Sequence, residues 1–96
     1  MKLANTILNQ LGGNTFITMT GAKNLFGDRF CLSFRVMKNS SGITHVQIRV
    51  NSVDLYDLIF YKMWGTKIKA VETIDNVGVE NLKAVFTDKT GLDTSL

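Results

Sequence analysis

The sequence predicts a single α+β domain, an antiparallel β-meander of about five strands with an N-terminal and a C-terminal helix (α-β-β-β-β-β-α). Three observations predict it. Apolar residues recur at helical spacing near both ends of the chain, they alternate with polar residues in the middle, and 96 residues are enough for one core. Residues 1–96 are therefore expected to fold as one domain.

The first element is a helix with an apolar stripe at spacings i, i+4, i+5 and i+8, formed by Leu3, Ile7, Leu8 and Leu11. Gly12 and Gly13 end it, because glycine readily adopts the left-handed conformation of a helix C-terminus. Residues 14–20 are rich in β-branched and aromatic side chains and predict the first strand. Residues 21–28, with two glycines, predict a loop.

Alternation is clearest in residues 30–50, which predict a β-hairpin around a polar turn at residues 38–42. The inward side is expected to carry Phe30, Leu32, Phe34 and Val36, followed by Val46, Ile48 and Val50. The outward side is expected to carry Cys31, Ser33, Arg35 and Met37, followed by His45, Gln47 and Arg49. The turn would place Val36 opposite a residue near Thr44, and Cys31 nearer to Arg49 than to His45.

After a turn at residues 51–54, residues 55–64 are apolar on both faces and predict a central strand or one covered on both sides. Residues 67–74 predict a fifth strand, in which Lys67 and Lys69 indicate a solvated face or a guarded edge. Asp75 or Asn76 is expected to cap the last helix. Its apolar face would comprise Val79, Leu82, Val85 and Phe86. Gly91 followed by Leu92 resembles a left-handed helix end.

Composition limits the classes of function. The formal net charge is +3, yet residues 1–50 carry six Lys or Arg against one Asp, whereas residues 51–96 carry five Lys against seven acids. No apolar run approaches the roughly 20 residues of a membrane span, so no membrane partner is expected. The lone cysteine excludes an intrachain disulfide and fits a reducing, cytoplasmic location.

The sequence contains few residues that could act in catalysis or bind a metal. One cysteine and one histidine are too few for a structural zinc site, so no metal, no cofactor and no enzymatic activity are expected. Asp54 is better explained as a turn residue than as a metal ligand. The segment Gly21–Asn24 lacks the glycine–lysine–hydroxyl order of a phosphate loop. Its amides, beside Lys23, could still hold an anion.

Two binding hypotheses remain. Residues 55–64 are rich in the types enriched at protein interfaces, which favours a protein partner or a homodimer. The candidate interface residues are Tyr56, Tyr61, Met63 and Trp64. A basic sheet face would instead favour nucleic acid, with exposed aromatic side chains stacking on bases. The candidate contacts are Lys23, Arg35, Lys38, Arg49, Lys67 and Lys69.

Several short stretches resemble a family of uncharacterised proteins of bacteriophages and mobile elements. They are residues 11–14 with Phe16, residues 19–24, 32–34, 50–51 and 54–57, and residues 90–92 with 94–96. The resemblance implies a small accessory protein in the cytoplasm of a bacterial host and carries over no activity or site. With the residues above, it favours a non-enzymatic protein that acts by protein–protein binding, with nucleic-acid binding as the alternative.

Overall fold

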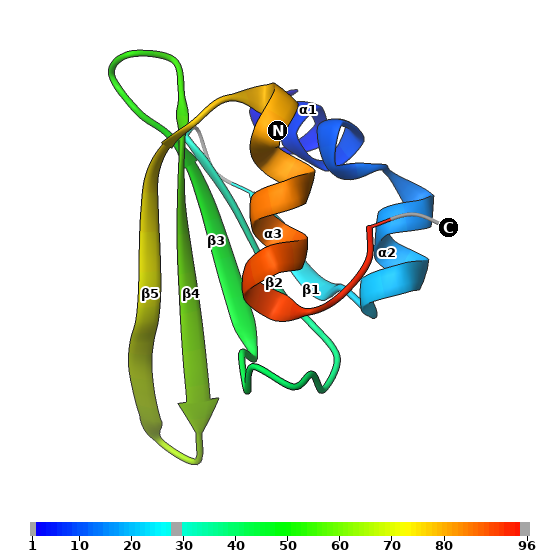
Figure 1. Cartoon of the computed structure of the whole chain (residues 1–96), viewed down its shortest axis with the longest axis vertical. Coiled ribbons are helices and arrows are strands. Elements are labelled where there is room, and N and C mark those ends of the chain that lie inside the picture. The colour runs from blue at the N-terminus through cyan, green and yellow to red at the C-terminus, as the bar shows by residue number, and fades with distance from the viewer. Residues whose placement is uncertain (1, 28–29, 95–96) are drawn as a thin grey trace.

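The computed structural model describes residues 2–27 and 30–94, with the backbone alone for residues 2–4. Within these residues, five strands form one antiparallel sheet in the order β1-β2-β3-β4-β5, and the three α-helices lie on one side of it (Figure 1). The strands are β1 (Lys23–Gly27), β2 (Cys31–Arg35), β3 (His45–Val50), β4 (Tyr56–Trp64) and β5 (Lys67–Val77). The helices are α1 (Lys2–Leu11), α2 (Asn14–Thr20) and α3 (Leu82–Thr90), the last preceded by the 3₁₀ turn η1 (Val79–Asn81).

The predicted α+β class, with a five-stranded antiparallel sheet and a helix at each end, is therefore confirmed. Some sequence expectations fall outside the described residues. They concern Asp28 in the predicted loop, Ser95 and Leu96 in the last motif of the resemblance, and the side chain of Leu3.

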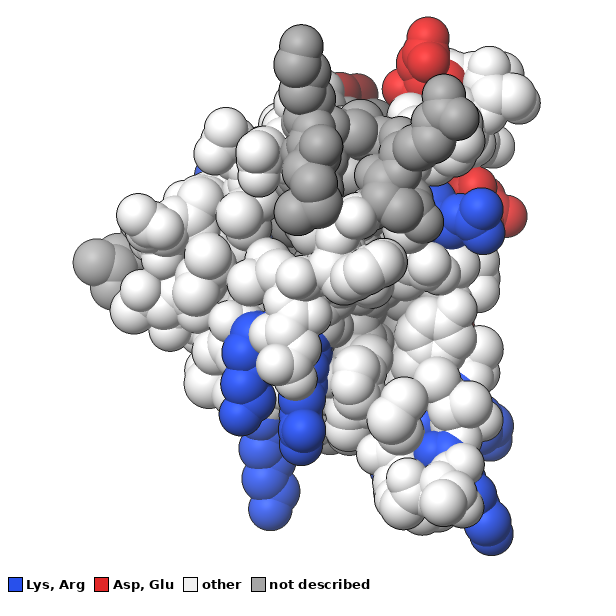
Figure 2. Space-filling view, turned by 180° about the vertical axis from the view of Figure 1, so that it is seen from behind, with Lys and Arg blue, Asp and Glu red and all other residues white. Residues whose placement is uncertain are grey.

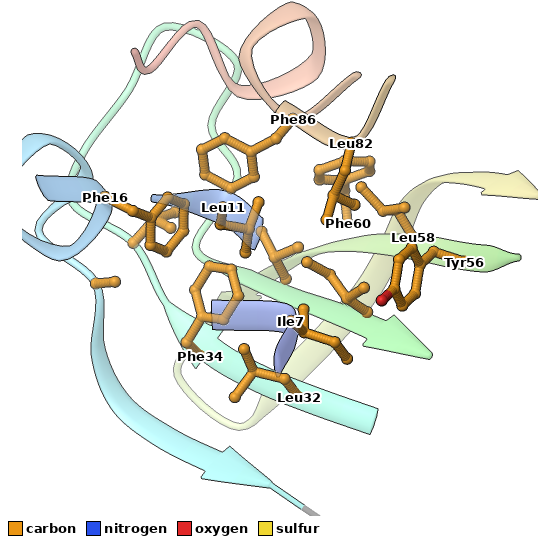
Figure 3. Packing of buried hydrophobic residues seen from close by; sticks show 14 of the residues in the cluster. Ile7, Leu11, Phe16, Leu32, Phe34, Tyr56, Leu58, Phe60, Leu82 and Phe86 are labelled. Atoms are coloured by element: carbon orange, nitrogen blue, oxygen red, sulfur yellow. The ribbon is translucent and has the colours of Figure 1, made fainter. Parts of the chain in front are cut away.

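The core lies between the helices and the face of the sheet that they cover (Figure 3). Phe16 from α2, Phe34 from β2 and Phe86 from α3 meet at its centre. The ring of Phe16 lies 5.4 Å from that of Phe34 and 5.2 Å from that of Phe86, both edge to face. Aromatic rings prefer this arrangement, and burying three of them removes much apolar surface from water. These contacts pack α2, near the N-terminus, and α3, near the C-terminus, against the sheet.

The hairpin of β2 and β3 has the predicted register. Cys31 pairs with Arg49 and Arg35 pairs with His45, while the Val36 amide donates to the Thr44 carbonyl at 3.0 Å. Phe30 is the exception on the inward side. It precedes β2 and its side chain is exposed, although its carbonyl accepts a hydrogen bond from the Val50 amide at 2.8 Å.

The prediction of a strand over residues 14–20 is wrong, since this segment is the helix α2. Its first turn closes when the amide of Ile17 donates to the Gly13 carbonyl at 3.1 Å. Phe16 and Thr20, four residues apart, are both fully buried on one side of the helix. The Thr20 hydroxyl donates to the Phe16 carbonyl at 2.7 Å, so this polar group is satisfied inside the core. Tertiary packing thus overrides the β-propensity of the segment.

Residues 21–28 were expected to form a loop, but residues 23–27 form the edge strand β1. Lys23 pairs with Arg35 and Phe26 pairs with Ser33, with an irregularity between the two pairs. Asn24 has a positive φ of 55° there. Such a bulge hides the two-residue period by which a strand is recognised in a sequence.

The last helix begins later than predicted. β5 continues through Asp75 and Asn76 to Val77, so neither residue caps a helix, and α3 starts at Leu82 after η1. Asn76 is held by the neighbouring turn instead: its amide donates to Asp57 at 3.1 Å, and its side-chain oxygen accepts from Asn51 at 2.8 Å. These bonds fix the end of β5 against the start of β4.

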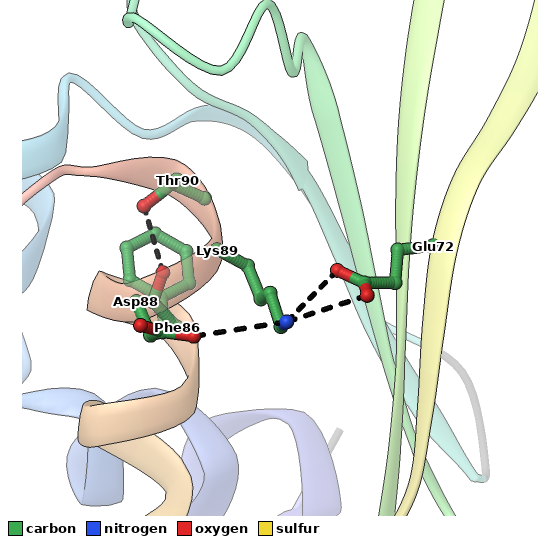
Figure 4. A network of polar contacts seen from close by, with 5 residues as sticks. All are labelled: Glu72, Phe86, Asp88, Lys89 and Thr90. Carbon is green, nitrogen blue, oxygen red and sulfur yellow. Dashed lines mark hydrogen bonds and ion pairs between the residues drawn. The ribbon is translucent and has the colours of Figure 1, made fainter.

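The end of α3 matches the prediction. Gly91 has a φ of 74°, and its amide donates to the Thr87 carbonyl at 2.8 Å. Thr90 is buried and donates its hydroxyl to the Phe86 carbonyl (Figure 4). Lys89 reaches across to the sheet, where its ammonium group lies 3.1 Å from a carboxylate oxygen of Glu72 on β5. This partly exposed pair orients α3 on the covered face more than it stabilises the fold.

Candidate binding site on the open face of the sheet

The face of the sheet opposite the helices, which we call the open face, carries two rows of partnered side chains. Residues directly opposite each other in an antiparallel pair point to the same face. One row runs through Lys23, Arg35, His45, Tyr61 and Ala70. The next row runs through Phe26, Ser33, Gln47, Ile59 and Thr73. β4 is therefore interior in the sheet, as predicted, but helices cover only one of its faces.

A shallow hollow of about 250 Å³ lies on the open face. All five strands contribute to its lining, which includes Asn24, Arg35, His45, Tyr61 and Ile68. Ser33, Gln47 and Met63 add a hydroxyl, an amide and a thioether. Because it crosses the whole sheet, the hollow is suited to an extended ligand with both polar and flat apolar parts.

Hydrogen bonds order the floor of the hollow. The hydroxyl of Tyr61 donates to Gln47 Oε1 at 3.3 Å, and Gln47 Nε2 lies 3.6 Å from the sulfur of Cys31. Thr44 Oγ1 and His45 Nδ1 share a hydrogen bond of 2.7 Å. The tyrosine ring and the imidazole are thereby held in place before any ligand arrives, which lowers the ordering cost of binding.

His45 is expected to titrate below its ordinary pKa of 6.5. Partial burial lowers the pKa most, and the positive charge of Arg35 lowers it further. The variant Arg35→Gln should raise the pKa of His45 without bringing it back to 6.5, since the burial remains. Titration of the imidazole protons by NMR measures this directly, because the chain has a single histidine. An unchanged pKa would contradict the coupling between the two side chains.

Basic side chains gather at the end of the sheet where β1 begins, β2 ends and the β4–β5 hairpin turns. We call this the basic end and define it as residues 20–26, 33–47 and 60–71. These segments contain six Lys or Arg and no Asp or Glu. Figure 2 shows most of the visible blue side chains at this end, and the red ones toward the opposite end with a blue group beside them. The six are Lys23, Arg35, Lys38, Lys62, Lys67 and Lys69.

The predicted nucleic-acid contacts do not all lie close together in the structure. Lys23 and Arg35 are partners on the open face, and Lys38 is exposed in the loop after β2. Arg49 lies far from them, because it pairs with Cys31 and Asp57 toward the opposite end of the sheet. By the alternation of β2 and β3 it still shares the open face with Arg35, as expected, but it lies outside the basic end.

Unlike Arg49, Lys67 and Lys69 point away from the open face. They pair with Trp64 and Lys62 on β4, which alternate with the open-face residues Tyr61 and Met63. They therefore belong to the basic end but lie on the other side of the β4–β5 hairpin, where the hairpin extends beyond the helices (Figure 1). The ammonium group of Lys62 lies 5.9 Å from the centre of the Trp64 ring.

Of the predicted interface residues, some are exposed and one is buried. Tyr56 is 7% exposed and lies in the covered face, where its hydroxyl donates to Gln10 of α1 at 2.6 Å. Burial raises its pKa, an effect that the bond to Gln10 partly offsets. It anchors α1 to the sheet and is unavailable to a partner. Met63 and Trp64 are 41% and 46% exposed at the basic end.

Cys31 and His45 do not form a catalytic pair. They sit at opposite ends of the β2–β3 ladder, where Cys31 pairs with Arg49 and His45 with Arg35. Among residues 2–27 and 30–94, no group of three or more His, Cys, Asp and Glu could hold a metal ion. In the same part of the chain, no helix has the length and hydropathy of a membrane span.

Sequence reasoning missed the hollow itself. The alternation placed Ser33, His45 and Gln47 on the outward side of the hairpin without indicating a shared site, Asn24 was noted only within the Gly21–Asn24 segment, and Ile68 had no predicted role. The outward alternation of residues 31–37 and 45–49 was the available signal. It could not reveal that α1, α2 and α3 lie on the other face, since that depends on how the chain turns before β1 and after β5.

Comparison with known proteins adds no family to these observations. No family model matches the sequence, and no curated protein or solved structure is significantly similar to it. The functional argument therefore rests on the geometry of the open face and the basic end.

Proposed function

We propose that this protein is a non-enzymatic binding protein whose open face takes up single-stranded nucleic acid. The observation that carries the proposal is the hollow that crosses all five strands beside the paired cations Lys23 and Arg35. No acidic residue lies within the segments of the basic end to oppose a phosphate backbone.

The chemistry of the hollow matches such a ligand. Lys and Arg neutralise phosphates and release counterions, which gives affinity without sequence preference. Tyr61 offers a ring on which a base could stack, in the way that sheet faces commonly bind unpaired bases. Asn24, Ser33 and Gln47 supply donors and acceptors for base edges. A duplex would present no exposed base to these groups.

The proposal is tested by fluorescence anisotropy with labelled single-stranded and double-stranded oligonucleotides across a salt series. We expect single strands to bind more tightly, with affinity falling as salt rises. Three phosphate contacts would give a slope of about −2 in a plot of log affinity against log salt. Arg35→Gln should weaken binding about tenfold, because it removes a charged hydrogen-bond donor from the hollow.

Arg49→Gln is the matched control, since it removes the same charge from the same strand ladder but at the opposite end. It should change the affinity by less than about twofold. Absence of binding at low salt, or an equal loss in the two variants, would overturn the proposal. Tyr61→Ala should cost about 1–3 kcal/mol of binding free energy if a base stacks on its ring.

A second candidate is the protein–protein role first suggested by residues 55–64. Tyr56, Leu58 and Phe60 of that segment are buried in the core. The exposed remainder, Met63 and Trp64 with the neighbouring Ile68, favours a small contact at the β4–β5 hairpin. A protein partner would then bind at the same end as the nucleic acid.

We also propose, from the resemblance alone, that the protein is an accessory protein of a bacteriophage or mobile element in the cytoplasm of its bacterial host. Both binding roles are compatible with that origin. Because fold and origin do not determine activity, the binding experiments decide between them.

A further inference from the structure

We infer that β5 is a self-complementary edge that pairs antiparallel with β5 of a second copy, joining two sheets into one. This inference rests on β5 alone and is independent of the nucleic-acid proposal. β5 is an edge strand of eleven residues, much longer than the other edge, β1, with five. Residues 67–73 are all exposed, including the apolar Ile68 and Val71.

The bulge in β5 decides which of its residues share a face. Lys69 pairs with Lys62, and Glu72 pairs with Phe60. Lys62 and Phe60 are two residues apart on β4, so they point to the same face. Lys69 and Glu72 therefore also share a face, although an odd separation of three residues would place them on opposite faces of a regular strand.

A two-fold axis between Ala70 and Val71 would place Lys69 of each copy opposite Glu72 of the other. In an antiparallel pair, opposite residues must point to the same face, and Lys69 and Glu72 meet this condition. The flanking pairs meet it too. Ile68 would face Thr73, both from the open face, and Lys67 would face Ile74, both from the covered face.

Charge favours this pairing over others. Lysines on an edge strand protect it against unrelated strands, which must desolvate them without compensation. The same lysines find carboxylates only in a strand whose charges run in the reverse order, and an antiparallel second copy supplies one. A parallel arrangement in register would instead place Lys69 opposite Lys69. We therefore expect β5 to pair with β5 of a second copy and not with unrelated strands.

Sedimentation velocity over a concentration series tests the inference. The unmodified protein should show a monomer–dimer equilibrium rather than a tight dimer, because one strand pair buries less area than a standard interface. Lys69→Glu and Glu72→Lys should each weaken the dimer at least about tenfold, since like charges would face each other twice. The double variant, with the charges exchanged, should restore dimerisation.

A strictly monomeric protein at every concentration, or a double variant no better than the single ones, would overturn the inference. Circular dichroism checks that each variant folds, because Glu72 also contacts Lys89. If Glu72→Lys does not fold, hydrogen exchange of the unmodified protein decides instead. Amides of β5 should exchange more slowly as concentration rises, while those of β1 should not change. Neither result depends on nucleic acid, so failure here leaves the proposed function standing.

Discussion

The variant Phe16→Ala is expected to lower the free energy of unfolding by about 3–5 kcal/mol. Phe16 is fully buried and contacts the rings of Phe34 and Phe86, so its loss leaves a cavity where α2, β2 and α3 meet. A domain of this size is stable by only about 5–15 kcal/mol, and the variant should be close to unfolding. Urea denaturation followed by circular dichroism measures the change.

Phe26→Ala is the matched control, because Phe26 is 64% exposed on β1. The same truncation there should cost less than about 1 kcal/mol. Equal losses in the two variants would show that α2 is not packed into the core. The comparison therefore tests the helix in residues 14–20, which the local sequence does not predict.

The variant Gly21→Ala is expected to cost about 2–4 kcal/mol, combining the left-handed backbone with overpacking. Gly21 has a φ of 64°, and a Cβ atom added there would lie 2.8 Å from the Cβ of Met37. Met37 cannot easily move away, because its amide donates to the Thr20 carbonyl at 2.9 Å. The junction between α2 and β1 therefore accepts only glycine.

The variant Gly65→Ala separates the cost of the left-handed backbone from the cost of overpacking. Gly65 has a similar φ of 58°, yet nothing lies within 4 Å of an added Cβ. This variant should lose only the backbone contribution of about 1 kcal/mol. Thermal or urea unfolding of the two variants, compared side by side, gives the difference. A Gly21→Ala variant as stable as Gly65→Ala would contradict the close approach of Met37.

Much of the fold could be predicted from short-range pattern. Alternation between Leu32 and Arg35 and between Val46 and Arg49 set the faces of the hairpin, and the five-residue turn set its register. Gly91 marked the end of the last helix because a left-handed residue favours glycine. These features depend on neighbours within a few residues, so the local sequence contains the information.

The candidate site could be predicted only in part. The sequence named Lys23, Arg35 and Tyr61, which the structure brings to one row of the open face. It also named Arg49 and Tyr56. The strand register places Arg49 toward the opposite end of the sheet. Tyr56 points to the covered face because it alternates along β4 with the open-face residues, as its partner Val50 does along β3. The burial of Tyr56 and the separation of Arg49 from the other cations both depend on strand order and register, which the local sequence does not give.

By itself, the sequence determined the class of the fold, the inward and outward sides of the central hairpin, and the shortage of catalytic groups. These follow from residue type and from periods of two or about four residues. Tertiary structure alone decided that residues 14–20 are helical, that one sheet face is left open, and that basic side chains from distant segments meet at one end. The physical reason is that burial and strand order depend on contacts between residues far apart in the chain, which no local period encodes.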